Sequence, residues 1–210
     1  IEFTPRAMTG LWLIPVFFVA IWVLRNLPKE SVVRKAALIS AGLGIIESLI
    51  GAWLVLGKLV GQDLSVTRAV VMALHHFNTT CLLAVITLTA YFTWGGERVR
   101  LKGQGAVLGA LGVGAFAMVG TIVSGAITAL GDTLFKPTDT FAGLARTMDP
   151  AAHFLERLRI AHPVISTSAT LYLLLGLAFV GTLRKSPQVN SLTRWTTTLL
   201  VLQLGHGALN

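Results

Sequence analysis

Long apolar runs recur along the whole chain, and they restrict its fold more than any other feature does. Each run is close to or above the roughly 18 residues that a helix needs to cross a bilayer. No run alternates apolar and polar residues with the period of a membrane β-barrel. The sequence therefore predicts an all-α integral membrane protein. The predicted spans are residues 9–24, 36–56, 69–94, 105–130, 160–183 and 193–209.

The charged residues are few and lie mostly between these spans. They make up 12% of the chain, with a net charge of +8. Their placement indicates orientation in a membrane rather than binding to nucleic acid. The loops after the first, third and fifth spans hold ten of the seventeen Lys and Arg residues, and the positive-inside rule places these loops in the cytoplasm. The ten are Arg25, Lys29, Arg34, Lys35, Arg98, Arg100, Lys102, Arg184, Lys185 and Arg194.

Two parts of the chain resemble each other weakly, which indicates an internal duplication. The segment LRNLP at residues 24–28 matches LRKSP at residues 183–187, with an offset of 159 residues. Two further matches keep the same order: SVVR at 31–34 with SLTR at 191–194, offset 160, and ESLIGA at 47–52 with QLGHGA at 203–208, offset 156. Duplicated halves are a common way to build membrane proteins. We therefore expect two tandem four-helix bundles with about eight helices, six of them in this chain. The expected halves are residues 1–96 and 97–210, with an outer loop at about 131–158.

Adjacent histidines interrupt the third predicted span. His75 and His76 lie about 100° apart on a helix, so they face different directions. Asn78 and Thr79 follow at positions that suit orienting a ligand or bonding a neighbouring helix. Polar side chains inside a membrane are costly and usually mark function. The stretch suits haem ligation by imidazole, and it equally suits polar contacts that join helices.

A further histidine lies at the outer entrance to the fifth predicted span. Arg157 and Arg159 precede His162 by about one helical turn. Imidazole binds haem iron, and guanidinium groups pair with propionates. The alternative is that both arginines are anchors at the membrane interface. Upstream, Asp149-Pro150 predicts the N-cap and first turn of a short helix that leads into the span.

Several other residues have both structural and functional interpretations. Glu47 is a carboxylate well inside a span, and it suits either a hydrogen bond between helices or a proton path. The span at residues 105–130 is rich in glycine, which favours close packing against a helix or a flat ligand. Cys81 is expected to be a packing residue and His153 an interfacial loop residue. His206 ranks below the other histidines as a ligand.

Four stretches resemble motifs of the haem A synthase family. IEFTPRAMTG resembles the EFTHR start of that family's second helix, and HHFNTTCLLA resembles the HxxNTxxLL motif of its fourth helix. SGAITALGDTLF followed by AAHFLERLRIAHPV resembles the outer loop and sixth helix. LQLGHGALN resembles the GALN segment of the seventh helix. The resemblance covers nearly the whole chain and implies an eight-helix fold in two halves.

The resemblance implies an oxidoreductase that converts a methyl group of haem O to the formyl group of haem A for cytochrome oxidase. One half would hold haem b, and the other would receive haem O as the substrate. The implied partners are the haem O synthase, an electron acceptor and the lipid bilayer, within a homo-oligomer or a larger membrane complex. The implied location is a bacterial inner membrane, with the haem sites toward the outer face. The site residues implied are Glu2 for catalysis, His75 and His162 (His76 less so) for iron, and Arg157 and Arg159 for haem binding.

One position departs from the family. Pro5 stands where the EFTHR motif has histidine, and proline cannot bind iron. A haem in the first half would then have His75 alone, or His75 helped by His76 or by water. The alternative to an enzyme is a haem-binding electron-transfer or non-catalytic structural subunit of a membrane complex. A transporter is disfavoured because, apart from Glu47, the polar residues gather at the outer end and not at the midplane.

Overall fold

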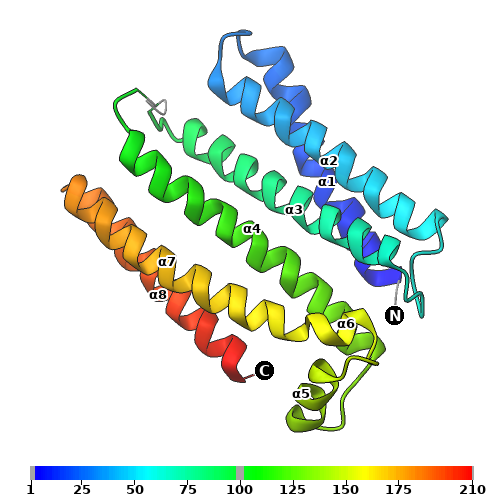
Figure 1. The fold of residues 1–210 in the computed structure, drawn as a ribbon. Coiled ribbons are helices and arrows are strands. Elements are labelled where there is room, and N and C mark those ends of the chain that lie inside the picture. The colour runs from blue at the N-terminus through cyan, green and yellow to red at the C-terminus, as the bar shows by residue number, and fades with distance from the viewer. Residues whose placement is uncertain (1–2, 98–101, 210) are drawn as a thin grey trace. The chain divides into compact units, whose positions relative to one another are not determined.

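The computed structural model describes residues 3–97 and 102–209, and within these ranges all regular structure is helical (Figure 1). This confirms the prediction of an all-α chain. The helices are α1 (Phe3–Asn26), α2 (Val32–Leu56), α3 (Val66–Thr93), α4 (Gly105–Leu134), α5 (Thr140–Met148), α6 (Phe154–Arg157), the 3₁₀ helix η1 (Leu158–Ile160), α7 (Ala161–Leu183) and α8 (Pro187–Leu209).

Four of the predicted spans are helices long and apolar enough to cross a membrane, with mean hydropathy between 1.7 and 2.1. The chain is therefore a multi-pass membrane protein by length and composition. The apolar part of α1, Leu11–Asn26, is shorter, and α8 carries many polar residues. Membrane crossing by these two helices stays a prediction. The four spans are Val32–Leu56, Val66–Thr93, Gly105–Leu134 and Phe154–Leu183.

Many large apolar side chains face away from the helix contacts. Leu49 is 64% exposed and Phe116 is 80% exposed. Such surfaces are unfavourable in water but suit the hydrocarbon of a bilayer, in which a helix satisfies its own backbone hydrogen bonds. The exposed apolar surface therefore agrees with a membrane environment.

Within unit 1 (Ile1–Val99), α2 packs against both α1 and α3 (Figure 1). Small buried residues line α2 at helical spacing, which lets its neighbours approach closely. Serine side chains begin two of these helices: Ser31 accepts a hydrogen bond from the backbone N–H of Arg34, at 3.4 Å, and Ser65 accepts one from Arg68, at 3.1 Å. Each cap satisfies an otherwise free backbone donor. The small buried residues of α2 are Ala36, Ala37, Ser40, Ala41 and Gly44.

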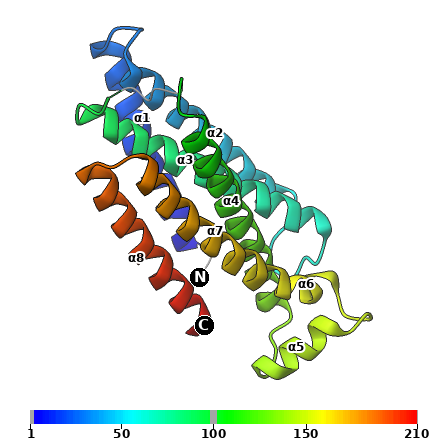
Figure 2. The ribbon, with the colours of Figure 1, turned by 60° about the vertical axis from the view of Figure 1, so that its left-hand side comes forward.

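Within unit 2 (Arg100–Asn210), α4 packs along α7, and α7 packs against α8 (Figure 2). The glycines of α4 contribute unequally to this packing. A Cβ at Gly131 would meet the backbone oxygen of Leu155 at 2.8 Å, so α4 and α6 approach closely there. By contrast, Gly105 and Gly109 have no neighbour within 4 Å among the described residues. The expected close packing is therefore confined to the part of α4 that faces α6 and α7.

The loop between α4 and α6 differs from the expectation that a helix begins at Asp149-Pro150. That pair instead ends α5, since the Asp149 carboxylate accepts from the backbone N–H of Ala151 at 2.8 Å and forms a turn. Helix α6 begins later, at Phe154, with His153 as its N-cap. The side chain of Asp149 therefore closes a turn with the residue two positions later. In a helix cap it would instead have accepted from the second or third backbone N–H of a helix.

Candidate functional site

In unit 1, the side chain of His75 lies beside a buried carboxyl group from α2. Its Nδ1 is 3.4 Å from Glu47 Oε1, which is longer than a hydrogen bond of good geometry. This nitrogen is buried and has no hydrogen-bond partner among the described residues. Glu47 itself is only 8% exposed. The Glu47 carboxyl group is therefore the acceptor that a proton on Nδ1 of His75 would face.

Two further side chains of α3 hold that carboxyl group in place. Asn78 donates to Glu47 Oε2 at 2.6 Å and to the backbone oxygen of Leu43 at 3.0 Å. The Thr79 hydroxyl bonds to Glu47 Oε1 and also lies 2.9 Å from the backbone oxygen of His75. The sequence predicted that Asn78 and Thr79 either orient a ligand or join neighbouring helices. In the structure they join α3 to α2 and anchor the carboxyl group that faces His75.

The neighbouring His76 turns away from this cluster. Its Nδ1 lies 2.9 Å from the backbone oxygen of Met72. A carbonyl oxygen only accepts, so Nδ1 carries the proton in the neutral ring and Nε2 carries the lone pair. The two imidazole rings have centroids 6.0 Å apart and an interplanar angle of 84°. The different directions predicted for His75 and His76 are therefore observed.

In unit 2, His162 of α7 contacts the glycine-rich helix α4. Its Nδ1 lies 3.1 Å from Ser124 Oγ, and the same hydroxyl donates to the backbone oxygen of Thr121 at 3.0 Å. A serine hydroxyl has one hydrogen, so with that hydrogen on Thr121 the oxygen accepts from His162 Nδ1–H. The remaining nitrogen, Nε2, then carries the lone pair that a metal requires.

The imidazole of His162 fits against a position without a side chain. A Cβ at Gly125 would lie 3.0 Å from His162 Cε1 and 3.3 Å from Nδ1. Beside this contact is a cavity of about 270 Å³ between α4, α7 and α8. That volume is slightly below the ~300–1,000 Å³ of typical ligand pockets. The lining residues are Met118, Thr121, His162, Pro163, Ser166, Thr167, Ala169, Thr170, Leu200, Gln203, Leu204 and Gly207.

These arrangements fit haem better than a bare metal ion. Within residues 3–97 and 102–209, no group of three His, Cys, Asp or Glu side chains converges to hold a metal. Haem requires only axial ligands from the protein, because the porphyrin supplies the other iron ligands. His162 offers Nε2 beside a cavity, and His75 has its Nδ1 turned to a carboxyl group. His162, beside its cavity, and His75, beside the Glu47 carboxyl group, are therefore the residues that would hold a haem iron.

Arg159 is already engaged by neighbouring groups. Its Nε donates to Asp132 Oδ1 at 2.5 Å, and Nη2 donates to the backbone oxygens of Gly131, at 3.4 Å, and Phe135. The third nitrogen, Nη1, is buried and has no partner among the described residues. Arg157, in contrast, is exposed. The two arginines that the sequence grouped as haem-binding therefore differ, and only Arg159 has a buried free donor.

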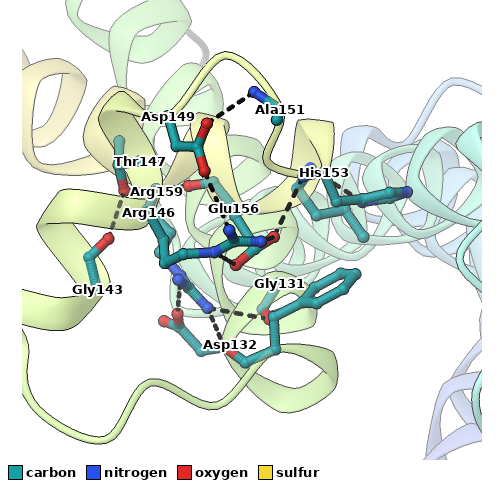
Figure 3. A network of polar contacts seen from close by, with 12 residues as sticks. Gly131, Asp132, Gly143, Arg146, Thr147, Asp149, Ala151, His153, Glu156 and Arg159 are labelled. Carbon is teal, nitrogen blue, oxygen red and sulfur yellow. Dashed lines mark hydrogen bonds and ion pairs between the residues drawn. The ribbon is translucent and has the colours of Figure 1, made fainter.

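An ion-pair network holds the loop next to Arg159 (Figure 3). Arg146 of α5 binds Glu156 through two contacts of 3.1 Å, and it also meets Asp149 at 3.1 Å. The hydrogen bond and then the charge of Glu156 hold the pKa of Arg146 above its usual value. Glu156 accepts from the backbone N–H of His153 at 3.2 Å, which completes a capping box. His153 is therefore a helix cap in this network.

The remaining candidates are placed as follows. Glu2 lies outside the described residues. His206 lies in α8 and is exposed, and Cys81 is a half-buried free thiol in α3. The sequence did not identify Ser124 as a partner of His162, and it named no hydrogen-bond partner for Glu47. Ser124 had only one signal, its position directly before a glycine in the glycine-rich span.

The comparisons with known proteins agree with this architecture. The family model COX15-CtaA, described as a cytochrome oxidase assembly protein, matches residues 1–210. Proteins named protoheme IX farnesyltransferase from two strains of Thermus thermophilus are each 42% identical over 210 residues, which is all of this chain and 34% of each relative. The chain thus spans about a third of the length of these relatives. No solved structure matches it. The chain belongs to the COX15-CtaA family of cytochrome oxidase assembly proteins.

Proposed function

We propose that the chain is a haem A synthase-type oxidoreductase that converts haem O to haem A for cytochrome oxidase. The observation that supports this most strongly is the setting of His162, with Nδ1 on the Ser124 hydroxyl and the ring seated on Gly125 beside a cavity. An imidazole held in this way presents Nε2, the usual axial ligand of haem iron. Membership of a cytochrome oxidase assembly family supports the same conclusion.

In unit 2, His162 and Arg159 are the residues that would hold haem b. His162 would supply a nitrogen ligand to the iron through Nε2, and Ser124 would keep the proton on Nδ1, on the opposite side of the ring. Arg159 has a free, buried Nη1 one turn before His162, so it suits pairing with a haem propionate. Arg157 is exposed and suits a second propionate contact or the membrane interface. Haem b supplies one-electron chemistry when bound.

Unit 1 would receive haem O. His75 would supply the iron ligand, with His76 as the weaker alternative, and Glu2 is the proposed catalytic carboxylate at the first-half motif. Oxidising a methyl group to a formyl group removes four electrons and four protons and adds one oxygen atom, supplied by water in the balanced half-reaction. The electrons pass to a separate acceptor, and the carboxylate of Glu2 suits removal of a proton.

The curated relatives support the proposed partner. Their name, protoheme IX farnesyltransferase, describes a protein in which a stretch similar to this chain makes up 34% of the length. Attachment of a farnesyl group to protohaem gives the haem O type of substrate. We therefore propose the haem O synthase as a partner of this protein. The two would bind each other directly or within a larger membrane complex, in which this protein could form a homo-oligomer. The proposed location is a bacterial inner membrane, with the haem sites toward the outer face.

The test is expression in cells that make haem O but lack their own haem A synthase, followed by pigment extraction and chromatography. We expect haem A or its hydroxylated precursor in cells that carry the unmodified chain, and neither in cells that carry His162→Ala. Immunoblotting of the membranes checks that both proteins accumulate equally. Extracts with unchanged haem O from cells rich in the unmodified protein would rule the enzyme out.

One observation favours a second candidate, a haem-binding electron-transfer or structural subunit. Pro5 takes the place of a family histidine in the first half. The same experiment separates the two candidates, because this subunit would bind haem b without forming any oxidised product. Restoring the family residue, Pro5→His, is then expected to add a second axial ligand to the first-half haem and change its spin state.

A further inference from the structure

A buried carboxyl group in α2 has no role in the function proposed above. Glu47 is 8% exposed in a helix that is apolar enough to span a membrane. Ionisable side chains in such helices are costly and are usually retained for function. We propose that Glu47 is the positioning residue of the first-half haem site, holding the Nδ1 side of His75 so that Nε2 is presented to iron. This inference rests on the proposed haem-binding function.

The register of the α2–α3 hairpin brings the two side chains to the same level. Glu47 lies nine residues before the end of α2 at Leu56, and His75 lies nine residues after the start of α3 at Val66. At 1.5 Å per residue, both lie about 14 Å along their helices from the connecting turn. Their contact therefore follows from the pairing of the two helices and does not depend on a flexible loop.

The contacts of the carboxyl group leave one of its oxygens directed at His75. Oε2 is occupied by Asn78, while Oε1 meets Thr79 and lies 3.4 Å from His75 Nδ1. That nitrogen is buried without another partner among the described residues. Histidines that bind metals commonly donate their second N–H to a carboxylate, which sets the tautomer and the orientation of the ring. A movement of a few tenths of an ångström would close this contact.

The other half differs at the corresponding position. The offset of 156 residues in the internal repeat relates Glu47 to Gln203, which lines the cavity beside His162. Within unit 2, the partner of the histidine is the Ser124 hydroxyl. Among the described residues, the position in unit 2 that the repeat relates to Glu47 thus carries an amide, and unit 1 carries a carboxyl group there. We infer that the carboxyl group serves His75 and is not a general feature of helix packing.

The experiment isolates the first half in full-length protein that carries His162→Ala, loaded with haem b. Glu47→Gln is added to this background, and Ser48→Ala is the matched control, because the Ser48 hydroxyl bonds only to the backbone oxygen of Gly44, at 3.0 Å. We expect Glu47→Gln to weaken haem binding by about 10- to 100-fold. It should also lower the iron–histidine stretching frequency of the ferrous haem and raise its reduction potential. Ser48→Ala should change none of these.

Two further variants separate positioning from helix packing. Asn78→Ala removes one of the two hydrogen bonds that join Glu47 to α3 but leaves the carboxyl group beside His75. It should lower thermal stability with little change in the iron–histidine frequency. Glu47→Asp should partly restore the frequency that Glu47→Gln lowers.

Equal frequencies and affinities in Glu47→Gln and Ser48→Ala would overturn the proposal. The proposal would also be overturned if the His162→Ala protein bound no haem while the unmodified chain made haem A. That result would leave the proposed function intact. Absence of both haem binding and haem A in the unmodified chain would overturn the proposed function itself.

Discussion

The two histidines that we assign to haem iron are held by different chemistry. In unit 1, His75 faces the carboxyl group of Glu47 from α2. In unit 2, His162 bonds to the hydroxyl of Ser124 and rests on Gly125 of α4. A carboxyl partner strengthens an imidazole ligand more than a hydroxyl does, and a stronger ligand favours ferric iron. The comparison predicts that the first-half haem has the lower reduction potential.

The two histidines also differ in how they are packed. His75 has a side-chain exposure of 29% and lies nine residues after the start of α3, a helix of 28 residues. His162 lies at the start of α7, directly after the 3₁₀ segment η1. Its ring lies so close to Gly125 that a Cβ at that position would come within 3.0 Å of Cε1. The first site therefore depends mainly on polar contacts, and the second depends mainly on shape.

The largest expected effect comes from removing each histidine separately. His162→Ala should abolish haem absorption from the second half and leave the first-half signal. His75→Ala should remove most of the first-half signal and leave that of the second half, because each imidazole supplies an iron ligand and His76, which turns to the backbone oxygen of Met72, is only the weaker alternative. Absorption spectra of purified protein, titrated with dithionite, measure both signals. Loss of all haem from either single variant would show that the two sites are not independent, and the comparison would then fail.

The next effect tests the shape of the second site. A Cβ at Gly125 would lie 3.0 Å from His162 Cε1, while one at Gly120 would meet only Ile165 Cγ2, at 3.8 Å. Overpacking costs about 1–3 kcal/mol, which corresponds to roughly 5- to 140-fold weaker haem binding. Gly125→Ala should show this loss in a haem titration, and Gly120→Ala should bind haem like the unmodified chain. Equal affinities in the two variants would remove shape as the basis of the second site.

The sequence was sufficient to predict the helices and the facing of the histidines, because apolar length and the 100° turn per residue are local properties. It did not predict the partners. The Glu47–His75 contact depends on the register between α2 and α3, which no local pattern contains. Arg159 was expected to be available to a ligand, but its Nε is bound to Asp132, 27 residues away. Helix α5 was also missed, since its nine residues are far fewer than the roughly 18 of an apolar run that crosses a bilayer.

The smallest effect tests the hydroxyl partner of the second site. Ser124→Ala removes one hydrogen bond, worth about 0.5–1.5 kcal/mol, so haem affinity in the second half should fall roughly 3- to 10-fold. Thr133→Ala on the same helix is the control, because its hydroxyl bonds only to the backbone oxygen of Ala129, at 2.8 Å. Haem titrations in a His75→Ala background measure both variants. Since a hydroxyl polarises imidazole less than a carboxyl group does, Ser124→Ala should shift the reduction potential less than Glu47→Gln shifts that of the first half. A larger shift from Ser124→Ala would reverse the order of the two sites, and the assignment of the stronger ligand to His75 would be wrong.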